Sequence, residues 1–214
     1  MAQEGRGDKE AARATLERLA GERDYYGFLA ADRLGLPYAF NHERLEAGGT
    51  RLVDELPAVR RIEELKFHND SVSAHAEWYR LLQDTDEPRE LQDLMLLASG
   101  KGWHRMAIDA AARAEAWDAL DQRFPTAHQS VFRQHAGIRS VPATELMAIA
   151  RRESAFYPRA ESPVGARGLM QIMPATGKSV AASLKVPHSR AKLFEVEHNV
   201  ELGSAYYRQL LDRF

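Results

Sequence analysis

The chain has 214 residues, a formal net charge of -2 at neutral pH and no cysteine. The near-neutral charge gives no reason to expect a nucleic-acid surface, and the lack of cysteine excludes disulfides, thiolate metal sites and a cysteine nucleophile. No run of about 18 apolar residues occurs, so we expect no membrane span, and a chain of this length holds one or two domains.

Residues 9–34 carry a helical pattern in two pieces that Gly21 separates. Gly35 and Pro37 are expected to end the second piece. Tyr25 and Tyr26 have the chemistry to stack on a sugar, but aromatic residues at helical spacing more often belong to a core. We therefore expect two core-forming helices here, followed by a connector over residues 36–50.

Four further helical segments are predicted over residues 54–67, 71–84, 88–99 and 102–123, the last with a break near Glu115. Apolar residues recur at helical spacing in each segment, as Leu56, Val59 and Ile62 do in the first. Short polar turns separate the segments, which is typical of antiparallel helix pairs stacked into an α-superhelix. Because residues 1–123 contain no chemical motif, we interpret them as a scaffold domain.

The next predicted helix ends in an acidic residue. Ser140 is its expected N-cap and Pro142 lies in its first turn. Glu153 occupies the next position on the apolar stripe of this helix, which comprises Leu146, Ile149 and Ala150. The pattern therefore places a carboxylate where an apolar side chain is expected.

Two interpretations of Glu153 follow from the helix alone. A carboxyl group that is held away from water has a raised pKa and can act as a general acid, which accelerates a reaction roughly 100- to 10,000-fold. The alternative is that Glu153 ends the helix with its side chain in solvent, or paired with Arg151 or Arg152.

The segment after the helix is punctuated by glycine and proline and reads ESAFYPRAESPVGARGLMQIMPAT from Glu153 to Thr176. Gly165 and Gly168 allow tight turns or close backbone approach. Gln171 lies among leucine, isoleucine and methionine residues, and an amide beside such side chains suits a sugar ligand.

A glycosidase that uses two carboxylates needs its second group close in space. No Asp or Glu occurs between Glu161 and Glu195, so proximity in the sequence offers only Glu161.

The segment from Glu153 to Thr176 resembles the signature motif of the lytic transglycosylase family. In that family the catalytic domain is lysozyme-like, and the Glu that opens the motif is the single catalytic residue. Two further segments resemble the large soluble, periplasmic members: WDALDQRFPTAHQSVFRQH resembles the lead-in to the catalytic domain, and YYGFLAADRLGLPY resembles the start of the linker module.

The resemblance implies a mainly α fold. Solenoid-like α-superhelical helix pairs are expected over residues 1–123, followed by a partial lysozyme-like domain over residues 124–214. Helices are expected over residues 128–135, 176–184 and 196–214. Family members continue with a helix that carries an Ala-Tyr-Asn-Ala-Gly motif, and no such string occurs here, so the domain is expected to be incomplete at its C-terminus.

The resemblance also implies an activity in the periplasm. The expected substrate is peptidoglycan, cleaved at the β-1,4 bond between N-acetylmuramic acid and N-acetylglucosamine to give a 1,6-anhydro sugar, with Glu153 as acid and then base and without metal or cofactor. Ser162, Gln171 and Met173 are expected to contact the glycan. The residues expected to support the active-site wall are Gly165, Gly168, Asn199 and Tyr206.

Two other functions stay open from the sequence. A lysozyme-like hydrolase would use water in place of the intramolecular hydroxyl, and would normally need a second carboxylate. A non-catalytic murein-binding or helical interaction module is the other, because the Ala-Tyr-Asn-Ala-Gly string does not occur.

Overall fold

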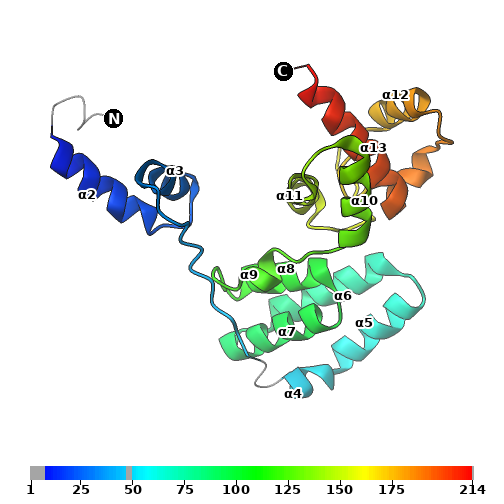
Figure 1. The fold of residues 1–214 in the computed structure, drawn as a ribbon. Helices are drawn as coiled ribbons and strands as arrows, with labels where there is room; N and C mark the ends of the chain where they lie inside the picture. The colour runs from blue at the N-terminus through cyan, green and yellow to red at the C-terminus, as the bar shows by residue number, and fades with distance from the viewer. Residues whose placement is uncertain (1–7, 47–49, 214) are drawn as a thin grey trace. The chain divides into compact units, whose positions relative to one another are not determined.

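The computed structural model of the chain describes residues 8–46 and 50–213. Within these ranges every regular element is a helix, apart from two isolated antiparallel β-bridges (Figure 1). The predicted mainly α fold is therefore confirmed. The chain divides into two compact units, Met1–Arg44 and Leu45–Phe214.

The first unit contains α2 (Lys9–Ala20) and α3 (Tyr25–Leu34). Asp8 and Asp24 cap the two helices by accepting hydrogen bonds from backbone N–H groups of their first turns. Gly35 ends α3 in the left-handed region at φ 65°, as predicted. The small core of this unit contains Ala20, Ala30 and Ala31.

The two tyrosines that were expected in a core are exposed. Tyr25 is 69% exposed and Tyr26 is 68% exposed, so the expectation that they are buried is wrong. The buried positions of α3 are instead Gly27, Ala30 and Ala31. A side chain at Gly27 would come within 2.0 Å of the carbonyl oxygen of Glu22, so small residues are what this close packing requires.

The second unit begins with six helices: α4 (Thr50–Asp54), α5 (Pro57–Phe67), α6 (Ser71–Asp84), α7 (Pro88–Gly100), α8 (His104–Arg113) and α9 (Leu120–Arg123). Proline is favourable at a helix start because the first N–H has no intrahelical acceptor, and Pro57 accordingly begins α5. The segment predicted over residues 54–67 is therefore split. The predicted break near Glu115 is confirmed, since α8 ends at Arg113 and Glu115 has φ 51°.

Helices α4 to α8 share one core, to which Ala119, the residue before α9, also belongs. Trp78 in this core is 1% exposed. Its indole N–H donates to the carbonyl oxygen of Met106 at 3.0 Å, so the buried polar atom is satisfied. Consecutive helices contact one another, α5 with α6 and α7 with α8, which matches the predicted pairs (Figure 1).

The chain continues with α10 (Gln129–Arg139), α11 (Ala143–Ser154), α12 (Pro174–Leu184), a 3-10 helix η1 (Arg190–Phe194) and α13 (Val196–Leu211). The sequence did not predict η1, and the predicted end of the last helix, Phe214, lies outside the described residues. The prediction of Ser140 as an N-cap is wrong. Ser140 has φ 53° and ends α10, while the extended residue Pro142 precedes α11 without a side-chain cap.

A second core joins these elements, with α10 packed against both α11 and α13 (Figure 1). Its largest fully buried side chains include Phe132, Leu146, Leu169 and Leu202. One residue of α8, Ile108, also belongs to it. Apart from Ile108, the residues of one core precede residue 123 in the sequence and those of the other core follow it. The domain boundary between residues 123 and 124 stays a prediction.

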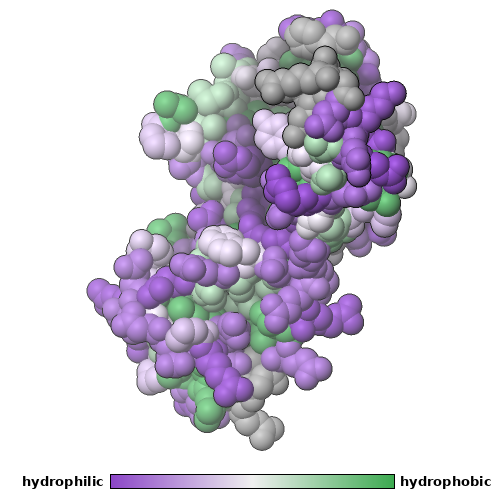
Figure 2. All heavy atoms as spheres, turned by 90° about the vertical axis from the view of Figure 1, so that its left-hand side faces the viewer, coloured by the Kyte–Doolittle hydropathy of each residue, from purple (hydrophilic) through white to green (hydrophobic). Residues whose placement is uncertain are grey.

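The surface is mostly polar on the face that Figure 2 shows, with hydrophobic residues scattered over it. Among the described residues, no helix is both long enough and apolar enough to cross a bilayer.

Candidate active site

The last turn of α11 carries Glu153, and its side chain is exposed. The expectation that Glu153 is partly removed from water is therefore wrong for this structure. The buried positions of α11 are Leu146, Ala150 and Ser154, which follow one another four residues apart. Glu153 lies at the edge of that face, where its side chain reaches solvent.

The end of α11 is held by the residue after Glu153. Ser154 is 4% exposed, and its hydroxyl donates to the carbonyl oxygen of Leu169 at 2.8 Å, with that of Ala150 at 3.2 Å. No role was predicted for Ser154, although its spacing of four residues from Ala150 indicates that it lies on the buried face of the helix. Ser154 thereby joins α11 to the glycine-containing loop.

The backbone turns sharply directly after this residue. Ala155 has φ 49° and Phe156 has φ 62°, a conformation that non-glycine residues adopt at a cost of about 1 to 3 kcal/mol each. The burial of Phe156, which is 4% exposed and packs edge-to-face on Phe132, offsets this cost. A left-handed residue also follows α10 and α12, so the turn at Ala155 is an ordinary helix ending, and the burial of Phe156 stabilises it.

A second turn lies at the predicted glycan-contacting residue Ser162. Its hydroxyl oxygen accepts from the N–H of Ala166 at 3.0 Å, and its carbonyl oxygen accepts from Gly165 at 2.8 Å. Gly165 has φ 89°, which a side chain would strain. The hydroxyl of Ser162 thus closes the turn and keeps its own proton available to a ligand.

The other two residues predicted to contact glycan differ in environment. Gln171 is partly buried with φ 46°, and its amide nitrogen donates to the carbonyl oxygens of Gly168 and Ala160 at 3.0 and 3.2 Å. Its amide oxygen is the group left for a ligand. Met173 is 41% exposed at the start of α12.

Asn199 connects α13 to the loop and is fully buried. Its Oδ1 accepts from the N–H of Met170 at 2.8 Å, and its Nδ2 donates to the carbonyl oxygens of Arg167 and Leu193 at 2.9 and 2.7 Å. Both N–H groups of this amide and one acceptor position of its oxygen therefore bond to backbone groups, and two of these, Met170 and Arg167, belong to the motif.

Two glycines make this contact possible. Gly168 has φ 74°, and an added Cβ would lie 2.1 Å from the carbonyl oxygen of Leu193 and 2.3 Å from Nδ2 of Asn199. A Cβ on Gly203 of α13 would lie 2.4 Å from the sulfur of Met170. The loop and α13 consequently approach as closely as backbone allows.

Tyr206, expected to support the wall, is 41% exposed. Its neighbour Tyr207 makes an exposed hydrogen bond, donating from its hydroxyl to Glu145 of α11 at 2.6 Å, and this bond raises the pKa of Tyr207. The structure therefore joins Gly168, Asn199 and Met170 directly. Within the described residues no hydrogen bond or ion pair joins Glu153 to Ser162 or Gln171.

Glu161, the other acidic residue of the motif, is paired with two arginines. It accepts from Arg167 at 2.7 and 3.1 Å and lies 3.7 Å from Arg190. Its backbone also bridges that of Arg167. Glu161 is thus bound as a structural ion pair, which leaves Glu153 as the motif's carboxylate without a cationic partner among the described residues.

One contact from the superhelix reaches this helix end and could not be predicted from sequence. Arg105 of α8 donates to the carbonyl oxygen of Ser154 at 3.2 Å, while its Nε donates to Asp109 at 2.9 Å. Cations stabilise the C-terminus of a helix because they complement its dipole.

No group of three His, Cys, Asp or Glu residues suited to a metal ion occurs in the described ranges.

The comparisons with known proteins agree with this architecture. The family model of the soluble lytic murein transglycosylase L domain matches residues 52–120, and that of the transglycosylase SLT domain matches residues 130–214. The chain belongs to the soluble lytic murein transglycosylase family. The recognition made from the motif is therefore confirmed.

Individual relatives cover almost all of the chain. It is 31% identical over 211 residues to the soluble lytic murein transglycosylase of Escherichia coli K12, an alignment that covers 98% of the chain and 33% of that protein. The crystal structure of the 70 kDa soluble lytic transglycosylase from Escherichia coli matches with a TM-score of 0.92 and 30% identity, over 99% of this chain and 34% of that one.

A third relative comes from Pseudomonas aeruginosa. The structure of an inactive mutant of its lytic transglycosylase Slt matches with a TM-score of 0.91 and 35% identity, over 100% of this chain and 35% of that chain. The chain thus spans about a third of the length of these relatives.

Proposed function

We propose that this chain carries the catalytic site of a peptidoglycan lytic transglycosylase, which cleaves the β-1,4 bond between N-acetylmuramic acid and N-acetylglucosamine. The observation that supports this most strongly is the matching of the L and SLT domains in order, together with a TM-score above 0.9 to two solved transglycosylases. Glu153 lies in the last turn of α11, directly before the loop of the family motif.

In the proposed reaction, the protonated carboxyl group of Glu153 donates its proton to the glycosidic oxygen. An oxocarbenium-like centre develops at the anomeric carbon as the bond breaks. The carboxylate then takes the proton of the muramic acid 6-hydroxyl, whose oxygen bonds to that carbon and closes the 1,6-anhydro ring. One carboxylate serves both steps because the nucleophile belongs to the substrate and has a high effective concentration.

The remaining motif residues are proposed to bind the glycan. The amide oxygen of Gln171 accepts from a sugar hydroxyl or N-acetyl group, the hydroxyl of Ser162 donates to one, and Met173 covers an apolar sugar face. Residues 124–214 form the proposed catalytic domain, and residues 1–123 form its scaffold. The proposed place of action is the periplasm, where peptidoglycan is accessible.

Release of soluble muropeptides from purified peptidoglycan, analysed by mass spectrometry, tests the proposal. The chain should release products that end in 1,6-anhydro-N-acetylmuramic acid. Glu153→Gln should lower the rate by at least about 100-fold, because it removes the proposed acid and base together. The matched control is Glu145→Gln on the same helix, which should retain the activity.

Two outcomes would contradict the proposal and support another function. Products with free reducing ends would indicate a lysozyme-like hydrolase. Retention of the chain on peptidoglycan without any released product, by the parent and by Glu153→Gln alike, would indicate a non-catalytic binding module.

A further inference from the structure

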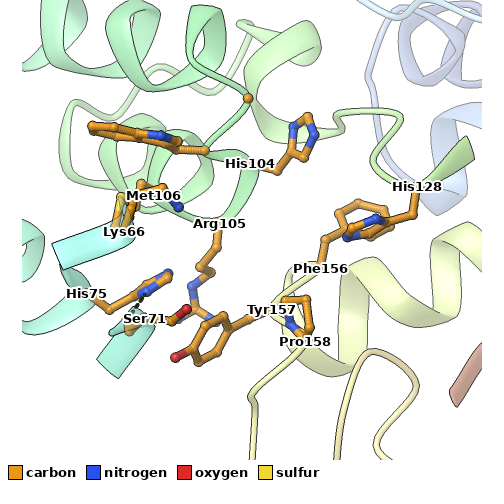
Figure 3. Close-up of a pocket in the computed structure, with 12 residues that line it drawn as sticks. Lys66, Ser71, His75, His104, Arg105, Met106, His128, Phe156, Tyr157 and Pro158 are labelled. Atoms are coloured by element: carbon orange, nitrogen blue, oxygen red, sulfur yellow. Dashed lines mark hydrogen bonds between the residues drawn. The ribbon is translucent and has the colours of Figure 1, made fainter. Parts of the chain in front are cut away.

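A cavity of about 250 Å³ lies within the second unit, beside the loop that follows Glu153 (Figure 3). Helices α5, α6 and α8 form one side of it, and the start of α10 and the loop after α11 form the other. None of its lining residues is acidic, and they include Lys66, His75, His104 and His128.

Lys66 supplies a positive charge to this cavity. Its Nζ lies 5.4 Å from the centre of the Trp103 ring, and burial lowers the pKa of the ammonium group. Lys101 also lies over that ring, but it is paired with Asp54 and Glu63, each at 2.7 Å. Within the described residues no carboxylate pairs with Lys66. A partly buried cation without a counter-ion is expected to attract an anion.

His75 supplies a second group. Its Nδ1 lies 2.8 Å from the carbonyl oxygen of Ser71, so this nitrogen carries the proton of the neutral ring. Its Nε2 is buried and has no hydrogen-bond partner among the described residues. The ring packs against Tyr157 at 4.3 Å between centroids (Figure 3). When protonated, Nε2 becomes a donor that lacks an acceptor, which an anion would provide.

The first turn of α8 supplies further donors. No side chain caps this ten-residue helix, and the N–H groups of its first turn have no acceptor within the helix. His104, Arg105 and Met106 of this turn line the cavity, and so does Trp103, the residue before the helix, whose own N–H donates to the carbonyl oxygen of Ala98. The N-terminus of a helix favours negative charge because of these N–H groups and the helix dipole.

We propose that this cavity binds a compact oxyanion, a phosphate or carboxylate group, between Lys66, His75 and the first turn of α8. Arg105 adds little net charge, because Asp109 neutralises it at 2.9 Å. A metal ion is not favoured despite three histidines in the lining, since they form no group suited to a metal among the described residues.

Binding here would act on the candidate active site. Phe156, Tyr157 and Pro158 follow Glu153 within five residues and line the cavity opposite Lys66. An oxyanion would therefore connect the superhelix to the loop that leaves the catalytic helix. The binding proposal itself does not depend on lytic activity and is tested without it.

Isothermal titration calorimetry with inorganic phosphate and, in a second arm, with succinate tests the site at constant ionic strength. At least one of the two should bind at a single saturable site with a dissociation constant of about 1 mM or lower. The arm that binds more tightly identifies the source of the oxyanion. The indole N–H resonance of Trp103 should shift during the same titration, which locates the site.

Lys66→Met keeps most of the alkyl stem and removes the charge, so it should weaken binding by at least about tenfold. Lys178→Met, on the exposed face of α12, is the matched control and should bind as the parent does. Circular dichroism confirms that each variant is folded. Absence of saturable binding by the parent, or equal binding by Lys66→Met, would overturn the proposal.

Binding should also depend on pH. Burial lowers the pKa of His75, His104 and His128, so all three are mainly neutral at pH 7. The charged or titratable groups around them are Lys66, Arg105, Asp109 and Tyr157, with Asp70 and Arg159 near Tyr157. Sulfate, whose charge is constant, should therefore bind more tightly as the pH falls from about 7.5 to 5.5. Weaker binding at the lower pH would contradict the role of His75.

Discussion

Asn199 holds the motif loop against α13, and its replacement by alanine tests how much this single amide contributes. The change removes the acceptor of the Met170 N–H and the donor to the Leu193 carbonyl. The third partner, the carbonyl oxygen of Arg167, keeps the N–H of Ile172 at 3.0 Å. Two groups are therefore left unsatisfied.

Each buried backbone group that loses its partner costs about 1 to 3 kcal/mol, so Asn199→Ala should lower the free energy of unfolding by about 2 to 6 kcal/mol. The middle of this range, about 4 kcal/mol, corresponds to a roughly 1,000-fold larger equilibrium constant for opening. Urea unfolding followed by circular dichroism measures the global value. Hydrogen exchange at the Met170 amide measures the local one.

The matched control is Gln209→Ala, which removes an exposed amide from the same helix. It should change the free energy of unfolding by no more than about 0.5 kcal/mol. The reasoning fails if Asn199→Ala costs less than about 1 kcal/mol and leaves Met170 as protected from exchange as in the parent chain.

Three further changes test other contacts. Gly168→Ala should lower the free energy of unfolding by more than about 2 kcal/mol, because its Cβ would meet Leu193 at a positive φ, whereas the unobstructed Gly100→Ala in α7 should be neutral or stabilising in the same urea titration. Tyr207→Phe should cost less than about 1 kcal/mol, since its bond to Glu145 is exposed, and a larger loss would refute that estimate. Burial, followed by the charge of its neighbour His188, lowers the pKa of His198, so the folded state binds fewer protons than the unfolded state. Stability should then be full above the unfolded pKa of about 6.5 and fall at lower pH, and the melting temperature of His188→Asn should fall less over that range than that of the parent.

The sequence predicted the helical architecture because apolar periodicity reports which face of each helix is buried. Helix boundaries were predicted wrongly where one residue type suits two positions. Serine is a favourable N-cap, but Ser140 adopts the left-handed conformation and ends α10. The burial of Glu153 was also predicted wrongly, because apolar residues at every third or fourth position do not distinguish the centre of a buried helix face from its edge. Ser154, one residue later, takes the buried position.

Contacts between distant segments could not be predicted at all. The bond from Arg105 to the end of α11 joins residues 49 positions apart, and the cavity beside it is lined by side chains from α5, α6, α8, the start of α10 and the loop after α11. No spacing pattern in the sequence indicates contacts between segments this far apart. The motif from Glu153 to Thr176, in contrast, is contiguous, so its resemblance to a known family can be recognised from the sequence alone.

Digestion of purified peptidoglycan in water enriched in oxygen-18 tests most directly whether Glu153 drives attack by the substrate's own hydroxyl. Mass spectrometry should show anhydro products without the heavy isotope, and these products should disappear with Glu153→Gln. Incorporation of one oxygen-18 atom per cleaved bond would show that water is the nucleophile and would contradict the account.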